Sequence, residues 1–551
     1  MDLIKFYALG GLDEDGRNMS VIEINDELYI VDVGLKYPEN ETLGVESQIP
    51  DFSHVLKNKE NVKGIFITHG HDDVMGALPY LMKELKAPIY TTPLIALMIQ
   101  DLLREHKIKN TKIFRIKKNG RFKVQGRNCV AFALTHSIPD SMGIAIETDQ
   151  GYIVHSSEFI MDFNVPSEAF TMDLSTISEL GKKGVFMLFA ESVYAKRQGF
   201  TSPHHRIEQR IEKVFENTEE RIFVTLYEQN IYRLIEVIEM ARKFKRRVYI
   251  YGEKQRRLIK HLEALNYYKM PEGMEISSKE FNNDMKDVVI VVSDIGPDVF
   301  RKMGKIAMGE DQVIEIKETD HVIVASPQVP GTESVASEMT NELFKDGVSI
   351  TSMNPKEVLS MHASIEDLKM MMALLKPKYY VPIKGEFQDL TANADLAFDM
   401  GIPPTNIIVL DNGQIAEFVD GRLKSTSQTF KLESVLIDGK DHLDTSGLVL
   451  RDRKILGTDG AITVGVVMDH RTKKIIGGPD VQSRGVVYLK DAKNLMNEAG
   501  KILVSTIEKN VKENKYEHIE TRNEARDKIS KFIFKETGKR PMIMPVIIEL
   551  R

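Results

Sequence analysis

The sequence of 551 residues contains a single cysteine, Cys129, and has no long apolar run. One cysteine excludes an internal disulfide framework and any zinc site built on thiolates, so a metal would have to be held by histidines and carboxylates. No run approaches the roughly eighteen consecutive apolar residues that a membrane span requires. The N-terminal segment has no basic stretch followed by an apolar one, so we expect no signal peptide and a location in the reducing cytoplasm.

Positive charge is too scarce for binding to nucleic acid through the overall electrostatic field. The net charge is −7, from 74 Lys and Arg against 81 Asp and Glu. Three short basic runs, at 117–123, 242–247 and 254–260, are interpreted more simply as solvated helix faces. Binding to nucleic acid would therefore depend on a local groove.

The chain is too long for one hydrophobic core, and its patterns change along the sequence. A hairpin is predicted over 18–35, followed by a buried strand over 62–70 and helical periodicity from Met75 to Leu85. From about 205 to 350, helices and strands alternate, which is typical of a parallel sheet flanked by helices.

The C-terminal part of the chain has a different organisation. The segment 426–444 is polar and has no clear period, as expected of a linker. After it, 447–551 predicts a small α+β domain, with strands near 460–468 and 486–489, helices across 490–535 and a terminal strand.

Histidines and acidic residues follow several of the predicted strands. The stretch "THGHDD" places His69, His71 and Asp73 in a strand-to-helix loop. His-x-His pairs are common by chance, so this stretch alone does not identify a metal site. His136 and Glu158 follow two further strands, and loops at one edge of a sheet can converge. Together these residues predict a nitrogen-rich site for Zn²⁺ or Mn²⁺.

Longer stretches resemble one known family in both order and spacing. The chain is similar to bacterial ribonuclease J, a member of the metallo-β-lactamase superfamily with an inserted β-CASP domain, and in particular to a degenerate second paralogue that accompanies an active ribonuclease J. The matching stretches are "ALGGLDEDGRNMSVIEI", "IVDVGLKYPENETLGV", "THGHDDVMGALPYL", "THSIPDSMG", "ASPQVPGTE", "HASIEDLKMMMALLKPKYYVPIKGE", "LVLRDRKIL", "GPDVQSRGVVYL" and "RPMIMPVIIEL".

This resemblance implies an α/β architecture. An αββα metallo-β-lactamase core would be formed by residues 1–210 and 355–430, with the β-CASP domain, a parallel sheet flanked by helices, inserted as 211–354. A linker over 431–449 and a small α+β C-terminal domain over 450–551 would follow. The resemblance also implies RNA as the substrate and two metal ions that activate a water for attack on the phosphodiester.

Active members of the family use seven ligand positions, and this chain departs from three of them. The four positions that match are His69, His71, Asp73 and His136. Glu158 stands where the family has a metal-bridging aspartate, and Val74 and Lys384 stand where it has histidines. Both lost histidines belong to the second metal. We therefore expect at most one divalent ion per chain, Mn²⁺ or Zn²⁺, weakly held, and an empty second site.

Lys384 admits two interpretations. Its ammonium could project to where the second metal belongs and pair with Asp73 and Glu158, whose buried charges would otherwise be costly. Alternatively, the side chain turns to solvent. The sequence leaves both open.

The substrate-binding elements that the resemblance implies are altered as well. In "VLSMHAS" the family's first histidine is Val358 and its glycine is Met361, and a methionine where backbone must approach phosphate would crowd that pocket. The related element "QNIYR" carries Tyr232. The positions still expected to contact RNA are Asn230, Arg233, Ser360 and His362.

Two functions remain open. The first is a weak, Mn²⁺-dependent RNA hydrolase with 5′-to-3′ exonuclease action, with or without endonuclease action. In it Asp73 would orient or deprotonate the water and His362 would be the general acid. The second is a nearly inactive subunit that contributes RNA-binding surface and assembles with an active ribonuclease J through its C-terminal domain, as a homodimer or hetero-tetramer. Hydrolysis of a small ester is disfavoured because the β-CASP domain implies nucleic acid. We favour a weakly active paralogue that works mainly as a partner.

Overall fold

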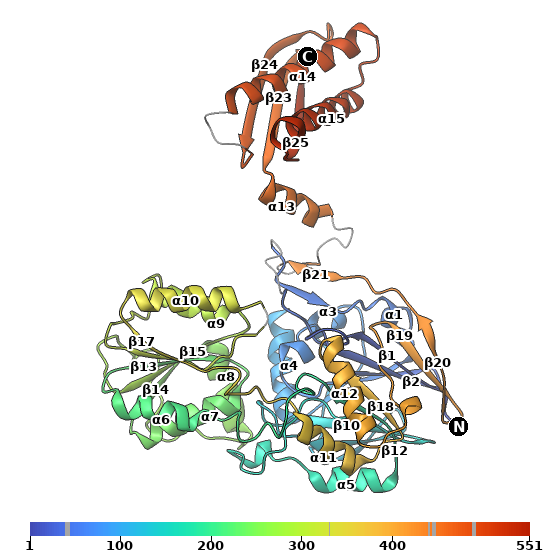
Figure 1. Cartoon of the computed structure of the whole chain (residues 1–551), viewed down its shortest axis with the longest axis vertical. Helices are drawn as coiled ribbons and strands as arrows, with labels where there is room; N and C mark the ends of the chain where they lie inside the picture. The colour runs from blue at the N-terminus through green and yellow to red at the C-terminus, as the bar shows by residue number, and fades with distance from the viewer. Residues whose placement is uncertain (39–43, 330, 439–440, 443–447, 487–491, 551) are drawn as a thin grey trace. The chain divides into compact units, whose positions relative to one another are not determined.

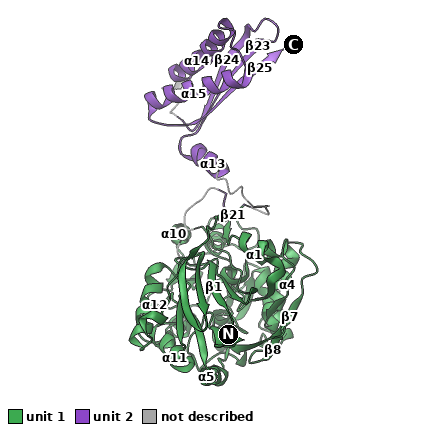
Figure 2. Cartoon of the chain, turned by 90° about the vertical axis from the view of Figure 1, so that its right-hand side faces the viewer, with its two compact units in different colours: residues 1–40, 46–437 green, residues 41–45, 438–551 purple. Residues whose placement is uncertain are grey.

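The chain divides into two compact units, which are described separately. A computed structural model describes residues 1–38, 44–329, 331–438, 441–442, 448–486 and 492–550. The larger unit comprises residues 1–40 and 46–437, and the smaller unit comprises 41–45 and 438–551 (Figure 2).

Two β-sheets form the centre of the larger unit (Figure 1). The strand order of the eight-stranded sheet is β20 (Arg422–Thr429), β19 (Gln414–Val419), β1 (Ile4–Gly10), β2 (Met19–Ile24), β3 (Glu27–Val31), β5 (Val62–Phe66), β6 (Ile89–Thr91) and β7 (Ile113–Arg115). The order of the six-stranded sheet is β18 (Tyr379–Ile383), β12 (Val185–Glu191), β11 (Gly151–His155), β10 (Met142–Thr148), β9 (Arg127–Ala133) and β8 (Arg121–Val124).

Alternating side chains place one face of each sheet against the other sheet and the opposite face against helices. In β1, Phe6 packs into the core between the sheets, whereas its neighbour Tyr7 faces the helix side. In β9, Cys129 and Phe132 divide in the same way. The covering helices are α1 (Ser53–Lys57), α2 (Asp72–Met75), α3 (Leu78–Met82) and α4 (Pro93–Glu105) on the first sheet and α5 (Leu174–Lys183), α11 (Ile365–Leu375) and α12 (Phe387–Asp399) on the second. The αββα core expected from the sequence is confirmed.

An inserted domain interrupts this core between β12 and β18. The two strands pair in parallel, with Glu191 opposite Ile383, although the whole inserted domain lies between them in the sequence. Its five-stranded sheet is parallel throughout. The strand order is β14 (Arg247–Tyr251), β15 (Val288–Asp294), β13 (Ile222–Tyr227), β16 (His321–Val324) and β17 (Ser349–Ser352).

Helices cover both faces of this parallel sheet, so its strands are continuous apolar runs such as "VVIVV" (Figure 1). The helices on one face are α6 (Glu208–Asn217), α7 (Ile231–Lys243) and α8 (Glu253–Ala264). Those on the other face are α9 (Asp298–Ala307) and α10 (Glu333–Lys345). The parallel sheet flanked by helices is therefore present as predicted.

Two local expectations differ from the structure. The helical periodicity from Met75 to Leu85 belongs to two short helices, because the backbone N–H of Ala77 donates to the carbonyl of Val33 and Pro79 has no N–H to donate. Within the segment read as an unpatterned linker, β20 extends to Thr429 and 435–438 form strand β21, which pairs with β4 (Ser47–Ile49).

The smaller unit is a three-stranded sheet with helices on one side. The strand order is β24 (Ile475–Arg484), β23 (Ala461–Asp469) and β25 (Met542–Leu550), and the helices that pack on it are α14 (Ala492–Lys512) and α15 (His518–Thr537). Helix α13 (Leu448–Thr458) precedes β23 in the sequence. The strand expected near 486–489 falls mostly outside the described residues. Nowhere in the described parts of either unit is there a helix both long and apolar enough to span a bilayer.

A buried ion pair holds one end of the inserted sheet. The guanidinium of Arg221, whose side chain is 1% exposed, donates from Nε to Oδ1 of Asp320 at 2.8 Å and from Nη2 to Oδ2 at 2.5 Å. Its remaining N–H groups donate to the carbonyls of Asn283 and Glu315. Every charge-bearing nitrogen of this side chain is thus paired.

The substitution Asp320→Ala should leave this guanidinium buried without a counter-charge. We expect the free energy of unfolding to fall by about 3–5 kcal/mol, measured by urea denaturation. The control is Asp298→Ala, which removes an exposed pair with Arg301 and should change stability by less than about 0.5 kcal/mol. Equal changes in the free energy of unfolding for the two variants would contradict a stabilising role for the buried Arg221–Asp320 pair.

Candidate metal centre

Four candidate ligands meet at one edge of the two sheets. His69 and His71 follow β5 of the eight-stranded sheet, and His136 and Glu158 follow β9 and β11 of the six-stranded sheet. One potential ligand atom from each of the four residues can be chosen so that all lie within 4.8 Å of one another. The convergence follows from the topology, because both sheets present these strand ends at the same edge of the sandwich.

Hydrogen bonds on the outer nitrogens fix the orientation of the imidazoles. Nδ1 of His136 lies 2.8 Å from the carbonyl oxygen of Met361, and Nε2 of His71 lies 2.8 Å from Oγ of Ser137. Nδ1 of His69 lies 3.0 Å from Oγ1 of Thr68. Each ring therefore uses one nitrogen to hold its position and turns the other toward the common centre, as metal-binding histidines do.

The donor set fits a divalent ion. Within the described residues, Nε2 of His69 and Oε2 of Glu158 are buried and have no hydrogen-bond partner, which is unusual for polar atoms in a protein interior. Burial holds the pKa of His69 well below its usual value and lowers that of His71 to about 3, so both rings are neutral, the form that binds metal. Three imidazoles and a carboxylate suit Zn²⁺ or Mn²⁺.

Lys384 lies inside the site. Its ammonium donates to Oδ2 of Asp73 at 2.6 Å and also contacts Oε1 of Glu158. Lys384 is only 5% exposed, so the interpretation in which it turns to solvent is wrong. Burial alone would lower the pKa of Lys384, but the carboxylates of Asp73 and Glu158 raise it well above its usual value. Burial likewise would raise the pKa of Glu158, but Lys384 and His69 hold it well below the usual range.

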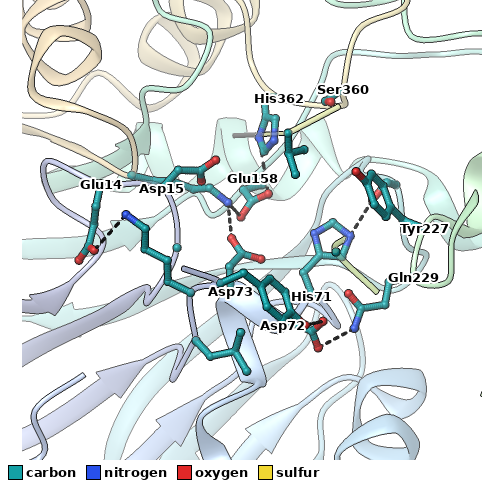
Figure 3. Close-up of a pocket in the computed structure, with 18 of the residues that line it drawn as sticks. Glu14, Asp15, His71, Asp72, Asp73, Glu158, Tyr227, Gln229, Ser360 and His362 are labelled. Carbon is teal, nitrogen blue, oxygen red and sulfur yellow. Dashed lines mark hydrogen bonds and ion pairs between the residues drawn. The ribbon is translucent and has the colours of Figure 1, made fainter. Parts of the chain in front are cut away.

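Asp73 and Val74 are fixed by close contact with the segment after β3. The backbone N–H of Val33 donates to the carbonyl of Val74, and a Cβ on Gly34 would lie only 1.6 Å from the carbonyl oxygen of Asp73. Glycine at position 34 is therefore required for this approach. Val74 is 1% exposed and supplies no ligand atom, whereas the Asp73 side chain reaches the pocket (Figure 3).

His362 is held by an acidic residue that the sequence interpretation missed. Nδ1 of His362 lies 2.8 Å from Oε2 of Glu191 and 3.5 Å from Oε2 of Glu158. Burial would lower the pKa of His362, but the Glu191 carboxylate outweighs it, so the pKa is raised. Glu191 ends strand β12 at the same sheet edge as the metal ligands, and that position was the signal that could have identified it.

Asp32 was also missed, although it supports the metal loop. It accepts hydrogen bonds from the backbone N–H and the hydroxyl of Thr68, at 2.9 and 3.1 Å. Because the same hydroxyl lies against Nδ1 of His69, Asp32 positions the first ligand through Thr68. It directly follows β3, again at the end of a strand.

A cavity of about 750 Å³ opens over these residues, between the core and the inserted domain. Asn230 lines it. Ser360, His362 and several acidic side chains also line it (Figure 3). The acidic residues of its wall are Asp13, Glu14, Asp15, Asp72, Asp73, Glu158, Glu228 and Glu386. The lining lysines are Lys36 and Lys384. The cavity therefore carries more acidic than basic groups.

Arg233, expected to contact substrate, does not line this cavity. It is 3% exposed, and its guanidinium donates to the carbonyl oxygen of Ala325 at 2.7 Å and to that of Leu359 at 3.5 Å. Its backbone N–H donates to the side-chain oxygen of Asn230, which is the N-cap of α7. Because the guanidinium of Arg233 is hydrogen-bonded to backbone carbonyls inside the protein, we infer that Arg233 holds the cavity wall in place.

Family models match four separate parts of the chain. They are the metallo-beta-lactamase superfamily (residues 12–138), the Ribonuclease J beta-CASP domain (219–343), the Zn-dependent metallo-hydrolase RNA specificity domain (352–407) and the Ribonuclease J C-terminal domain (448–550).

Full-length relatives agree with these matches. The chain is 33% identical over 549 residues to Ribonuclease J 2 of Staphylococcus aureus strain MRSA252, covering 99% of this chain and 98% of that protein. It is 32% identical to Ribonuclease J 2 of Staphylococcus epidermidis over the same shares. A crystal structure of a protein of unknown function from Enterococcus faecalis V583 matches with a TM-score of 0.51 and 14% identity, over 76% of this chain and 100% of that one, and shows likeness of fold alone.

The substitution His69→Ala should reduce metal binding. Loss of an outer-sphere partner alone weakens metal affinity by about 10–100-fold, and loss of a direct ligand should cost at least that much. We expect the Mn²⁺ or Zn²⁺ content after gel filtration, measured by inductively coupled plasma mass spectrometry, to fall at least about tenfold. The control is His54→Ala, which removes a histidine of α1 whose ring stacks on Phe430. Unchanged metal content in the His69 variant would contradict the assignment of His69 as a metal ligand.

Proposed function

The chain belongs to the ribonuclease J family, as its sequence predicts, and we propose that it is a weak metal-dependent ribonuclease that works mainly as the partner of an active ribonuclease J in the cytoplasm. The observation that carries this proposal is the division of the site. One half keeps three imidazoles and a carboxylate with unpaired atoms turned inward, and the other half contains the ammonium of Lys384. Such a site retains the ligands for one ion and lacks those for two.

The residues of the site have distinct proposed tasks in 5′-to-3′ hydrolysis. A divalent ion on His69, His71, His136 and Glu158 would supply Lewis acidity at the phosphate and lower the pKa of a water. Asp73, oriented by Lys384 and by an Asn18 side-chain N–H at 2.9 Å, would position that water for in-line attack. His362, with its pKa raised by Glu191, would keep a proton for the leaving oxygen.

Binding of RNA at this cavity is proposed to be weak. Asn230, Ser360 and His362 offer polar groups on its wall, but the surplus of acidic side chains opposes a polyanion. Met361 is 5% exposed and packs into the core, so backbone is not freely available there. These features support slow turnover and favour a contribution that does not depend on catalysis.

Assembly through the C-terminal domain, proposed as 450–551, has its own support. On the edge strand β25, Ile543 and Ile547 are buried against the helices, whereas the alternate side chains face outward. The outward residues are Met544, Val546, Ile548 and Leu550, which are 40%, 39%, 50% and 50% exposed. A row of exposed apolar side chains on an unpaired edge favours contact with another chain, either a second copy or the active paralogue.

A catalytically inactive, RNA-binding subunit is the second candidate function. The same observations favour it to the extent that Lys384 and the acidic wall prevent turnover altogether. A chain with this second function would show no RNA hydrolysis that depends on the metal ligands, and this distinguishes it from the weak ribonuclease.

A nuclease assay separates the two functions. With 5′-monophosphorylated RNA and Mn²⁺, the purified chain should release nucleotides slowly, and His69→Ala should abolish the release because the ion is lost. Equal activity of the two proteins would indicate a contaminating nuclease and end the enzyme proposal. Combining Val74→His, Glu158→Asp and Lys384→His should raise the rate; no gain would mean that the cavity wall limits turnover.

Charge on the outer face of β25 should block assembly. We expect the variant Val546→Glu/Ile548→Glu to shift to the monomer mass in light scattering coupled to gel filtration, since two carboxylates would be buried at the contact. Ile519→Glu, at a residue 57% exposed on α15, is the matched control and should assemble normally. An unchanged mass for the β25 variant would place the contact elsewhere.

A further inference from the structure

We propose that Lys384 is a built-in cation that takes the place of a second metal ion, holding the site together without metal and limiting it to one ion. The proposal rests on the one-ion site described above but concerns the ion-free half of that site. Three observations carry it: the contacts of the ammonium, the way the backbone fixes it, and the small cavity that it shares with Val74.

The ammonium contacts both carboxylates that a second ion would need. It lies 2.6 Å from Oδ2 of Asp73, and its contact with Oε1 of Glu158 is also direct. Oε2 of Glu158 lies on the other side, 3.3 Å from Nε2 of His136. Oε1, the oxygen that contacts the lysine, also lies 3.5 Å from Nε2 of His69, so the Glu158 carboxylate lies between the ammonium and the histidine cluster.

The backbone at Lys384 is arranged to deliver the side chain to this point. Its φ is 53°, a left-handed conformation that is uncommon for lysine. The backbone N–H of Lys384 donates to the carbonyl of Gly11 at 2.9 Å, and its carbonyl accepts from the backbone N–H of Ser192 at 3.0 Å. Both hydrogen bonds tie the residue to neighbouring core segments, so the ammonium is held in position.

A second, smaller cavity adjoins Lys384. The cavity behind the ammonium has a volume of about 20 Å³ and is lined by Val74, Lys384, Glu158 and Asp32 among others. This volume holds about one water molecule. The two positions where the family has histidines therefore meet at the same small cavity, one closing it with a methyl-bearing side chain and the other with a positive charge.

The charges explain why one ion suffices. Asp73 and Glu158 carry two negative charges, and Lys384 neutralises one of them. A dication on the histidine half would leave a single net positive charge. A further dication would have to displace the ammonium from both oxygens, and in doing so would bring three cations into one buried site. The lysine therefore competes directly with a second metal.

The test compares metal-free stability and metal stoichiometry in matched variants. After EDTA treatment, Lys384→Met should lower Tm by about 5 °C relative to the parent, because two carboxylates lose their counter-charge. The control Lys431→Met, which removes an exposed pair with Glu433, should change Tm by less than about 1 °C. The double variant Lys384→Met/Glu158→Gln should recover most of the loss, since one of the two charges is gone.

Metal content gives the second measurement. At saturating Mn²⁺ the parent should bind one ion per chain, and Lys384→His, which adds a ligand and removes the competing charge, should bind up to two. A metal-free Tm for Lys384→Met within about 1 °C of the parent would overturn the proposal, as would two ions bound by the parent. If Lys384→Met does not fold but the double variant does, the proposal is supported. If neither folds, the side chain acts through packing and the proposal fails. None of these outcomes alters the nuclease comparison with His69→Ala.

Discussion

The parallel pairing of β12 with β18 is the contact on which the rest of the larger unit depends. It rejoins two parts of the core that the inserted domain separates in sequence, and it does so in a fixed register, with Glu191 opposite Ile383. Glu191, the last residue of β12, lies beside Ile383, the last residue of β18, and Lys384 follows directly, so the Glu191 carboxylate that contacts His362 and the ammonium of Lys384 reach the same site. A slip of β18 by one residue would turn its side chains to the opposite face, because side chains alternate along a strand.

The site beside this pairing buries several ionisable side chains close to one another. Three imidazoles, two carboxylates and one ammonium lie close together, and burial by itself would remove the charge from Glu158 and Lys384. Glu158 and Lys384 keep their charges because the ammonium lowers the pKa of Glu158 and the neighbouring carboxylates raise the pKa of Lys384. The structure of the half without metal is therefore self-consistent, whereas the histidine half retains buried atoms that only an added ligand would satisfy.

Much of this arrangement could be predicted from the sequence, and the failures have physical reasons. Sequence patterns predicted the parallel sheet of the inserted domain, and the family resemblance implied the αββα core. Polar residues at strand ends pointed to His69, His136 and Glu158, because sheet edges bring such positions together. The sequence interpretation missed Glu191, although it ends a strand at the same sheet edge, because its partner His362 lies 171 residues further along the chain. The burial of Arg233 could not be predicted, because its partners are backbone carbonyls, which sequence does not display. The direction of Lys384 stayed open because it depends on a left-handed backbone angle set by contacts with distant segments.

The attachment of the ammonium to the chain has a consequence that no bound ion shares. An ion occupies its site according to its free concentration, and it leaves when supply falls or a chelator competes. A side chain is present at a local concentration fixed by the fold and unaffected by dilution. Occupancy of that half of the site is thus removed from mass action, and its charge is the same in a cell starved of manganese as in one that is replete.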